Sequence, residues 1–249
     1  MQSLFFSIII PTLNEEKNLP VLLTSLKKQT FRDFEVIISD SGSTDATPVK
    51  ARTYERVIRF FHFFTHKSKN VSAARNYGAN LAKGEFLVFF DADVEVEESF
   101  FEEIKKKIAS YQLDALTVWN RPKTNSLTGK FILALMNFNM SLFQHIKPAA
   151  NGPCIIIRKE LFKKIKGFDD SIVFGEDFNL IQKAHKLGAK FEVFKTPILY
   201  VSTRRFEKEG LLLSLYKSLK AIAHQLFIGP IRKPIFQYEM GGQYYEDKK

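Results

Sequence analysis

Phe86-Leu87-Val88-Phe89-Phe90-Asp91-Ala92-Asp93 joins a run of apolar residues to two acids that follow it directly. Five consecutive apolar residues predict a strand that is buried on both faces of a sheet. Such a strand carries its terminal acids to the edge where open α/β sheets bind their ligands. The stretch therefore predicts an α/β fold with an acidic site at one sheet edge.

The paired acids of this stretch allow two interpretations. Two carboxylates so close together repel each other unless a cation neutralises them. Oxygen ligands with no Cys or His beside them suit Mn2+ or Mg2+, which also bind substrate phosphates. The alternative is structural, with Asp91 capping the next helix and Asp93 on the surface. The spacing alone leaves both open.

Composition and charge narrow the class of protein. The 249 residues include 25 Phe, which predicts a large aromatic core or apolar surface left for a partner. Cys154 is the single cysteine, so no intramolecular disulfide forms and a reducing compartment fits. No apolar run approaches the roughly 20 residues of a membrane span, and Phe5 to Ile10 is too short for a signal peptide. We therefore expect a cytoplasmic protein.

The net charge of +10 favours a polyanionic partner. A nucleic acid, an anionic membrane surface and a phosphorylated substrate all meet that description. The charge does not choose among them.

Strand, loop and helix alternate in the first half of the chain. Strands are expected over 5–10, stopped by Pro11, and over 35–38, and each is followed by a polar loop and a helix. Asn14 is expected to cap the first helix and Asp45 the second. In a parallel sheet, the loops 11–15 and 39–45 would meet Asp91 and Asp93 at one edge.

The next elements add one candidate ligand. A strand is expected over 56–64, and a helix over 72–83 that ends at Gly84. Arg75 lies in the first turn of that helix, where the helix dipole disfavours a cation. It is either a contact to an anion or sugar, or a surface arginine. Residues 95–108 are expected to form a helix with a solvated face.

The second half supplies further candidates. Strands are expected over 115–119 and 153–157, with an apolar helix over 131–146 between them. We expect this helix to be buried rather than to face lipid or a partner. Glu176 and Asp177 open a helix after Gly175, where acids act as caps or as a general base.

The C-terminal segment is basic. Arg204 and Arg205 lie in an expected loop over 200–206, and guanidinium groups suit phosphate. A helix over 211–227 carries apolar residues on one face, and either docks on an anionic membrane or packs on the sheet. A polar tail is expected over 241–249.

Six motifs occur in a set order. They are SIIIPTLNE (7–15), SDSGSTD (39–45), ARNYG (74–78), KGE (83–85), DAD (91–93) and GED (175–177). The ordered set resembles the family 2 glycosyltransferases of the GT-A fold. The resemblance implies a Rossmann-like, mostly parallel sheet flanked by helices, with a C-terminal helical extension. It implies a catalytic domain over 1–205, with a nucleotide-binding half (1–95) and an acceptor-binding half (96–205), followed by a basic amphipathic extension and tail over 206–249.

The resemblance also implies roles for individual residues. Asp40 is similar to the acid that hydrogen-bonds the nucleotide base, and Arg75 to the sugar-nucleotide contact. Asp91 would meet the ribose or the metal, Asp93 the cation on the diphosphate, and Asp177 would be the catalytic base. The remaining implied contacts are Pro11, Thr12, Asn14 and Glu15 for the nucleotide, and Glu176, Arg204 and Arg205 for the diphosphate or acceptor.

Two departures from the family pattern limit what carries over. The segment Arg204-Arg205-Phe206 resembles the Arg-Trp loop of processive members, but Phe replaces Trp and the preceding Gln is missing. Processive synthesis is therefore not implied. Ser41 stands where many members have a second Asp, which leaves the base contact to Asp40.

The implied enzyme is inverting and moves a sugar from a nucleotide-diphosphate sugar, with UDP- and GDP-sugars favoured, to a sugar or lipid-linked acceptor. It would use Mn2+ or Mg2+. The apolar helix over 131–146 and the basic C-terminal helix would suit a lipid-linked acceptor and a peripheral contact with the cytoplasmic face of a membrane. A nucleotidyltransferase is one alternative, although these carry a Gly-rich basic loop where residues 11–16 have neither Gly nor a basic residue. A non-catalytic module that binds membrane or nucleic acid is the other. The acids of the crevice would repel phosphate without a metal, so no nucleic-acid partner is expected.

Overall fold

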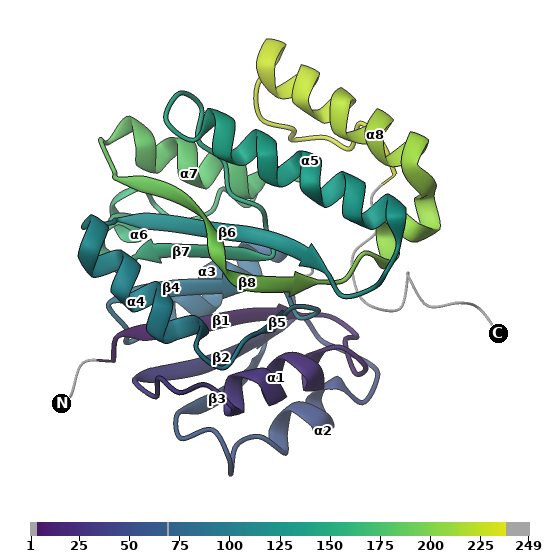
Figure 1. The fold of residues 1–249 in the computed structure, drawn as a ribbon. Helices are drawn as coiled ribbons and strands as arrows, with labels where there is room; N and C mark the ends of the chain where they lie inside the picture. The colour runs from purple at the N-terminus through teal and green to yellow at the C-terminus, as the bar shows by residue number, and fades with distance from the viewer. Residues whose placement is uncertain (1–3, 69, 238–249) are drawn as a thin grey trace.

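A computed structural model describes residues 4–68 and 70–237 of the protein (Figure 1). Its strands form one sheet in the order β3-β2-β1-β4-β7-β6-β8-β5. They are β1 (Phe6–Thr12), β2 (Phe34–Asp40), β3 (Phe61–Thr65), β4 (Phe86–Phe90), β5 (Glu95–Val96), β6 (Ala115–Pro122), β7 (Cys154–Arg158) and β8 (Phe191–Val201). Strands β1 to β4 pair in parallel, as do β6 and β8, whereas β7 and β5 run antiparallel to their neighbours. The expected mostly parallel α/β sheet is confirmed.

Helices cover both faces of the sheet. Residues of α1 (Leu19–Lys27), α2 (Thr47–Arg52) and α4 (Phe100–Tyr111) belong to the apolar core on one face. Residues of α3 (Val71–Leu81), α6 (Lys159–Lys164) and α7 (Glu176–Lys186) belong to the core on the other. Helices α5 (Leu127–Phe143) and α8 (Arg204–Phe227) pack together on the flank away from α1 and α2 (Figure 1).

Strand β4 lies at the centre of both cores, as its sequence predicts. Phe86, Val88 and Phe90 face one core, whereas Leu87 and Phe89 face the other, and all five are fully buried. Because side chains alternate along a strand, only an apolar run can be buried on both faces. Asp91 and Asp93 follow where the strand ends.

The first loops differ from expectation. Strand β1 continues through Pro11 to Thr12, so the proline does not stop it. Asn14 does not cap a helix: it has a φ of 54°, and its Oδ1 accepts a hydrogen bond from the backbone N of Thr44 at 2.8 Å. Helix α1 begins only at Leu19. The two loops are therefore tied to each other, which a local capping rule does not anticipate.

Three other boundaries of strands and helices differ from those expected from the sequence. The strand expected over 56–64 begins at Phe61, and the helix expected from Glu95 begins at Phe100, because Glu95 and Val96 pair with β8. Gly84 does not end α3 in the left-handed conformation. A Cβ at Gly84 would lie 2.6 Å from the backbone of Phe6, so glycine allows close approach to β1.

Helices α5 and α8 contradict the expected packing. The expected burial of α5 is wrong for its outer face, where Phe131 and Phe138 are exposed. Arg204 opens α8 instead of lying in a loop. In α8 the small residues Ser214 and Ala221 are buried, whereas the large apolar residues Leu212, Leu219 and Phe227 are exposed. No helix in the described part is long and apolar enough to cross a membrane, and the predicted tail over 241–249 lies outside the described residues.

Candidate active site

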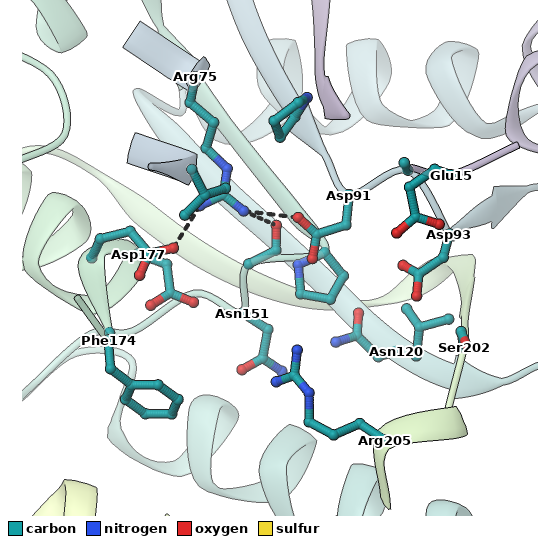
Figure 2. A pocket seen from close by; sticks show the side chains of 18 of the residues that line it. Glu15, Arg75, Asp91, Asp93, Asn120, Asn151, Phe174, Asp177, Ser202 and Arg205 are labelled. Atoms are coloured by element: carbon teal, nitrogen blue, oxygen red, sulfur yellow. Dashed lines mark hydrogen bonds and ion pairs between the residues drawn. The ribbon is translucent and has the colours of Figure 1, made fainter. Parts of the chain in front are cut away.

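The ends of the strands surround a cavity of about 320 Å³. Because β1, β2 and β4 are parallel, their carboxyl ends meet at one sheet edge. Phe90 at the end of β4 pairs with Cys154 at the start of the antiparallel β7, which brings residues 151–153 to the same edge. The N-terminus of α7 and the start of α8 complete the wall. Figure 2 shows how these side chains lie.

Arg75 organises one side of the cavity. Its side chain is only 2% exposed, and it donates to Asp91 Oδ1 and to Glu176 Oε1, each at 2.8 Å. It also donates to the carbonyl of Gly152 at 3.3 Å (Figure 2). Burial lowers the pKa of Arg75, but Asp91, Glu176 and Asp177 outweigh it and raise the pKa above its ordinary value. The guanidinium therefore stays charged and fixes the positions of the acids around it.

Asp177 lies beside this cluster at the start of α7. Gly175 precedes the helix with a φ of 77°, and a Cβ there would collide with Gln225, so the turn into the helix requires glycine. A Cβ added at Gly152 would lie 3.5 Å from Asp177 Oδ2 and 3.7 Å from Asp91 Oδ2, so both carboxylates approach the same point. Burial raises the pKa of Asp177 to about 7, with Glu176 adding to the rise and Arg75 opposing it. Such a carboxyl can accept a proton near neutral pH.

A second cluster of acids faces the first. Glu15, which follows β1, and Asp93 point toward each other (Figure 2), and Arg204 Nη2 lies 3.0 Å from Glu15 Oε1 and 3.4 Å from Asp93 Oδ2. Burial raises the pKa of Glu15 to about 7, while Arg204 lowers it. Burial and Asp91 also raise the pKa of Asp93. The acids are thus held close together, with less positive charge than their full ionisation requires.

The structure brings most of the residues singled out from the sequence to this cavity. Asn14 and Asp40 do not line it. Asp40 is buried and accepts hydrogen bonds from Thr12, from the backbone of Gly42 and from the backbone and hydroxyl of Ser43. Its neighbour Ser41 does line the cavity. The lining residues among those singled out are Pro11, Thr12, Glu15, Arg75, Asp91, Asp93, Glu176, Asp177, Arg204 and Arg205.

Two carboxamides were missed by the sequence analysis. Asn120 and Asn151 line the cavity and are each 3% exposed. Asn120 Oδ1 and Asn151 Nδ2 have no hydrogen-bond partner among the described residues. Asn151 follows from the antiparallel pairing of β7 with β4, but no sequence signal marks Asn120. Asn120 and Asn151 are therefore candidates for contact with a polar ligand.

The acidic residues fit a divalent cation that is shared with a phosphate. The described residues hold no group of three His, Cys, Asp or Glu side chains arranged around one point. Asp91 and Asp93 supply only hard oxygen ligands, and Mg2+-type ions are commonly bound by one or two carboxylates together with substrate phosphates. The raised pKa of Asp93 also indicates that its ionised form lacks compensating charge. A cation would supply that charge.

Comparison with known proteins agrees with this geometry. Residues 7–166 match the family model described as "Glycosyl transferase family 2". The chain belongs to this family. GlyA of Streptococcus pneumoniae, a glycosyltransferase, is 27% identical over 74% of this chain and 28% of its own length. AmsB of Erwinia amylovora, an amylovoran biosynthesis glycosyltransferase, is 25% identical over 80% of this chain and 69% of its own. The chain thus spans less than a third of GlyA but over two thirds of AmsB.

Solved structures whose fold is similar to that of this chain have the GT-A architecture. TarS of S. aureus, solved in complex with UDP-GlcNAc, has a TM-score of 0.65 and 24% identity, and covers 90% of this chain and 67% of its own. The mannosyltransferase PcManGT of Pyrobaculum calidifontis, solved with GDP-Man and Mn2+, has a TM-score of 0.67 and 19% identity, and covers 86% of this chain and 64% of its own. At these identities the likeness concerns the fold.

Proposed function

We propose that the protein is an inverting glycosyltransferase that moves a sugar from a nucleotide-diphosphate sugar to an acceptor hydroxyl. The observation that carries the proposal is the arrangement of Asp177, Arg75, Asp91 and Asp93 around one cavity in a member of glycosyl transferase family 2. Residues 1–95 would bind the nucleotide and residues 96–205 the acceptor, with 206–249 as an extension. The complexes of TarS with UDP-GlcNAc and of PcManGT with GDP-Man support a UDP- or GDP-sugar as donor.

The cavity offers a distinct place for each part of the donor. The nucleoside would lie along Pro11, Thr12 and Glu15, with Asn14 and Asp40 holding the loops that receive the base. Arg204 and Arg205, which line the cavity at the start of α8, would bind the diphosphate. Asp91 would contact the ribose or the metal. Asp93 and Asp91 would hold Mn2+ or Mg2+, which when bound stabilises the charge of the departing diphosphate.

The reaction is a single displacement. Asp177 accepts the proton of the acceptor hydroxyl as its oxygen forms a bond to the anomeric carbon. The bond from that carbon to the diphosphate oxygen breaks, and the nucleoside diphosphate leaves with the electron pair. Because the acceptor attacks from the face opposite the leaving group, the configuration inverts. Glu176 would help position the acceptor, which is a sugar or a lipid-linked hydroxyl compound.

Thermal melting with UDP, GDP, CDP and dTDP, each with and without Mn2+, tests the proposal. A ligand that binds only the folded state stabilises it by about 2.7 kcal/mol at a hundredfold excess over Kd. We expect a clear rise in Tm for one diphosphate that depends on the metal. Unchanged melting with every diphosphate, with and without metal, would contradict the proposed donor site.

A further inference from the structure

Helices α5 and α8 expose large apolar side chains on one flank of the molecule. On α5 these include Phe131, Phe138 and Leu142, and on α8 Leu212, Leu219 and Phe227. We call these six residues the docking face. Phe138 is 60% exposed and Leu219 is 66% exposed. Spacings of 4, 7 and 8 residues place the members from each helix on one side of it.

Basic residues outnumber acidic ones around these helices. Residues 121–147 contain four basic and no acidic residues, and residues 204–237, which begin with α8, contain seven basic residues and two acidic ones, Glu207 and Glu209. The rest of the chain is nearly balanced, with 26 basic residues against 25 acidic ones. Some of these cations have partners in the fold, since Lys217 pairs with Glu209 and Arg232 with Asp169. Residues 121–147 and 204–237 together therefore carry +9 of the net charge of +10.

We propose that the docking face inserts into the surface of an anionic lipid bilayer. Apolar side chains flanked by basic ones are typical of segments that lie in the membrane interface, where the apolar groups enter the acyl boundary and the cations meet anionic headgroups. The docking itself is independent of the proposed function. That a lipid-linked acceptor then reaches the site from the bilayer rests on the proposed function.

The charge pattern favours a bilayer over a second copy of the chain. In a twofold dimer the same surface meets itself. The basic residues beside the docking face, such as Lys130 and Lys147, would then approach their own copies with no acid from residues 121–147 to compensate. Like charges across an interface oppose association. An anionic bilayer instead attracts every one of them.

The docking face is connected to the active site through the same two helices. Leu133 and Met136 of α5 line the cavity, and so do Arg204 and Phe206 of α8. The segment after α8 returns to the loop in front of Asp177, where the backbone N of Val173 donates to the carbonyl of Ile231 at 2.9 Å. A helix pair lying on the bilayer would thus place the cavity wall next to the membrane surface.

Cosedimentation with lipid vesicles tests the docking. We expect the full chain, without any donor, to bind vesicles of phosphatidylcholine mixed with phosphatidylglycerol, and to bind more weakly at high salt or to phosphatidylcholine alone. Phe138→Ser and Leu219→Ser should each lower the partition coefficient about tenfold, as expected for one large apolar side chain. Lys130→Glu and Lys147→Glu should each lower it by about fivefold or more.

Matched variants on the far side of the molecule provide the controls. Val49→Ser changes a valine of α2 that is 70% exposed, and Lys28→Glu reverses an exposed charge after α1. Both should bind vesicles as the unmodified chain does. Equal losses in these controls, or no vesicle binding by the unmodified chain, would overturn the docking. So would a dimer in solution that Phe138→Ser converts to a monomer while vesicle binding stays absent.

Diphosphate-induced melting of the same samples separates this inference from the proposed function. A normal melting shift with no vesicle binding would overturn the docking alone. Vesicle binding with no melting shift would support the docking and contradict the donor site.

Discussion

Arg204 and Glu15 form an ion pair that joins the start of α8 to the loop after β1. They are 189 residues apart, and Arg204 Nη2 lies 3.0 Å from Oε1 and 3.2 Å from Oε2 of Glu15. The same guanidinium lies 3.4 Å from Asp93. The guanidinium of Arg204 therefore lies close to two acids. A diphosphate that enters the cavity would compete with both acids for this guanidinium.

Arg204→Met should weaken donor binding. Without this guanidinium, Glu15 and Asp93 repel the diphosphate, and we expect the Kd to rise about tenfold, which corresponds to about 1.4 kcal/mol. The loss should grow as the pH rises above 7, because burial raises the pKa of Glu15 to about 7 even with Arg204 opposing the rise, and without Arg204 this carboxyl ionises only at still higher pH. Titration calorimetry with the preferred diphosphate at two pH values measures this. Arg121→Met, which removes an exposed cation at the end of β6, is the control and should leave the Kd unchanged.

Asp177→Asn should abolish turnover while preserving donor binding. The amide keeps the size of the side chain but cannot take a proton, and general bases contribute at least about 100-fold. Initial rates with the donor identified by melting give kcat, and the diphosphate-induced shift in Tm reports binding. Asp170→Asn, an exposed aspartate of the preceding loop, should retain full activity. If Asp177→Asn kept its rate, another residue would have to be the base.

The rate should depend on the ionisation of Asp177. Its pKa is about 7, and it must be ionised to accept a proton. We therefore expect kcat/KM to rise with pH through a midpoint near 7 and then to level off. A pH–rate profile at fixed metal concentration measures this, and a profile that is flat from pH 5 to about 8 would contradict the assignment.

A rise in pH, which should increase the rate, should lower the stability of the fold. Carboxyls whose folded-state pKa is raised stabilise the fold below the unfolded pKa of about 4, and this contribution is lost as pH rises through the folded pKa. For Glu15 and Asp177 the window runs from about 4 to about 7. We therefore expect Glu15→Gln to gain stability relative to the unmodified protein as the pH is raised from 4 to 8. Chemical denaturation without ligands measures the free energy of unfolding of both proteins at the two pH values.

Much of the fold was predictable because it follows from local patterns. The five-residue apolar run of β4 could be buried on both faces only in the middle of a sheet, and the polar loops after β1 and β2 had to meet it at one edge. Strand β5 was missed because Glu95, Glu97 and Glu98 favour a helix start. Ala92, Val94 and Val96 are buried and alternate with more exposed neighbours. This alternation is typical of a strand, and in the fold it prevails over the helix preference of the glutamates.

The remaining features depend on contacts between distant segments. Asn14 accepts a hydrogen bond from Thr44 of the loop after β2. Arg204 lies beside Glu15 only because β8 ends at the same sheet edge as β1. Neither pairing leaves a local trace in the sequence. The outer face of α5 was misjudged for a similar reason, since an apolar helix does not show in its own sequence whether a neighbour covers it.

Arg75 should be a major source of stability as well as a ligand contact. Arg75→Met leaves Asp91 and Glu176 without their buried partner, and removing one member of such a pair costs about 3 kcal/mol. For a chain of this size the Tm should fall by roughly 6–12 °C. Lys163→Met breaks the exposed pair with Glu160 and should change stability by less than about 0.5 kcal/mol. Equal effects of the two substitutions would show that Arg75 has no special structural role.

Asn151 and Asn137 are both buried carboxamides, but we expect opposite results from replacing them. Asn137 Oδ1 accepts from the backbone N of Asn120 at 3.0 Å, and its Nδ2 donates to the carbonyl of Asn120 at 2.8 Å. Asn137→Leu would leave those backbone groups unpaired and should destabilise the fold by about 2 kcal/mol. Asn151 also lines the cavity, but its Nδ2 lacks a partner among the described residues.

Asn151→Leu should therefore leave stability unchanged or slightly raised, while impairing catalysis. An unsatisfied buried amide has an energetic cost that leucine removes, whereas a sugar hydroxyl bound by the amide would lose its hydrogen bond. We expect a rise in KM of about tenfold for whichever substrate meets Asn151, because one such bond contributes about 1 kcal/mol and an unpaired hydroxyl adds to the loss. Denaturation curves and steady-state kinetics on both variants measure this. A destabilised Asn151→Leu with normal KM values would show that Asn151 serves the fold and not the ligand.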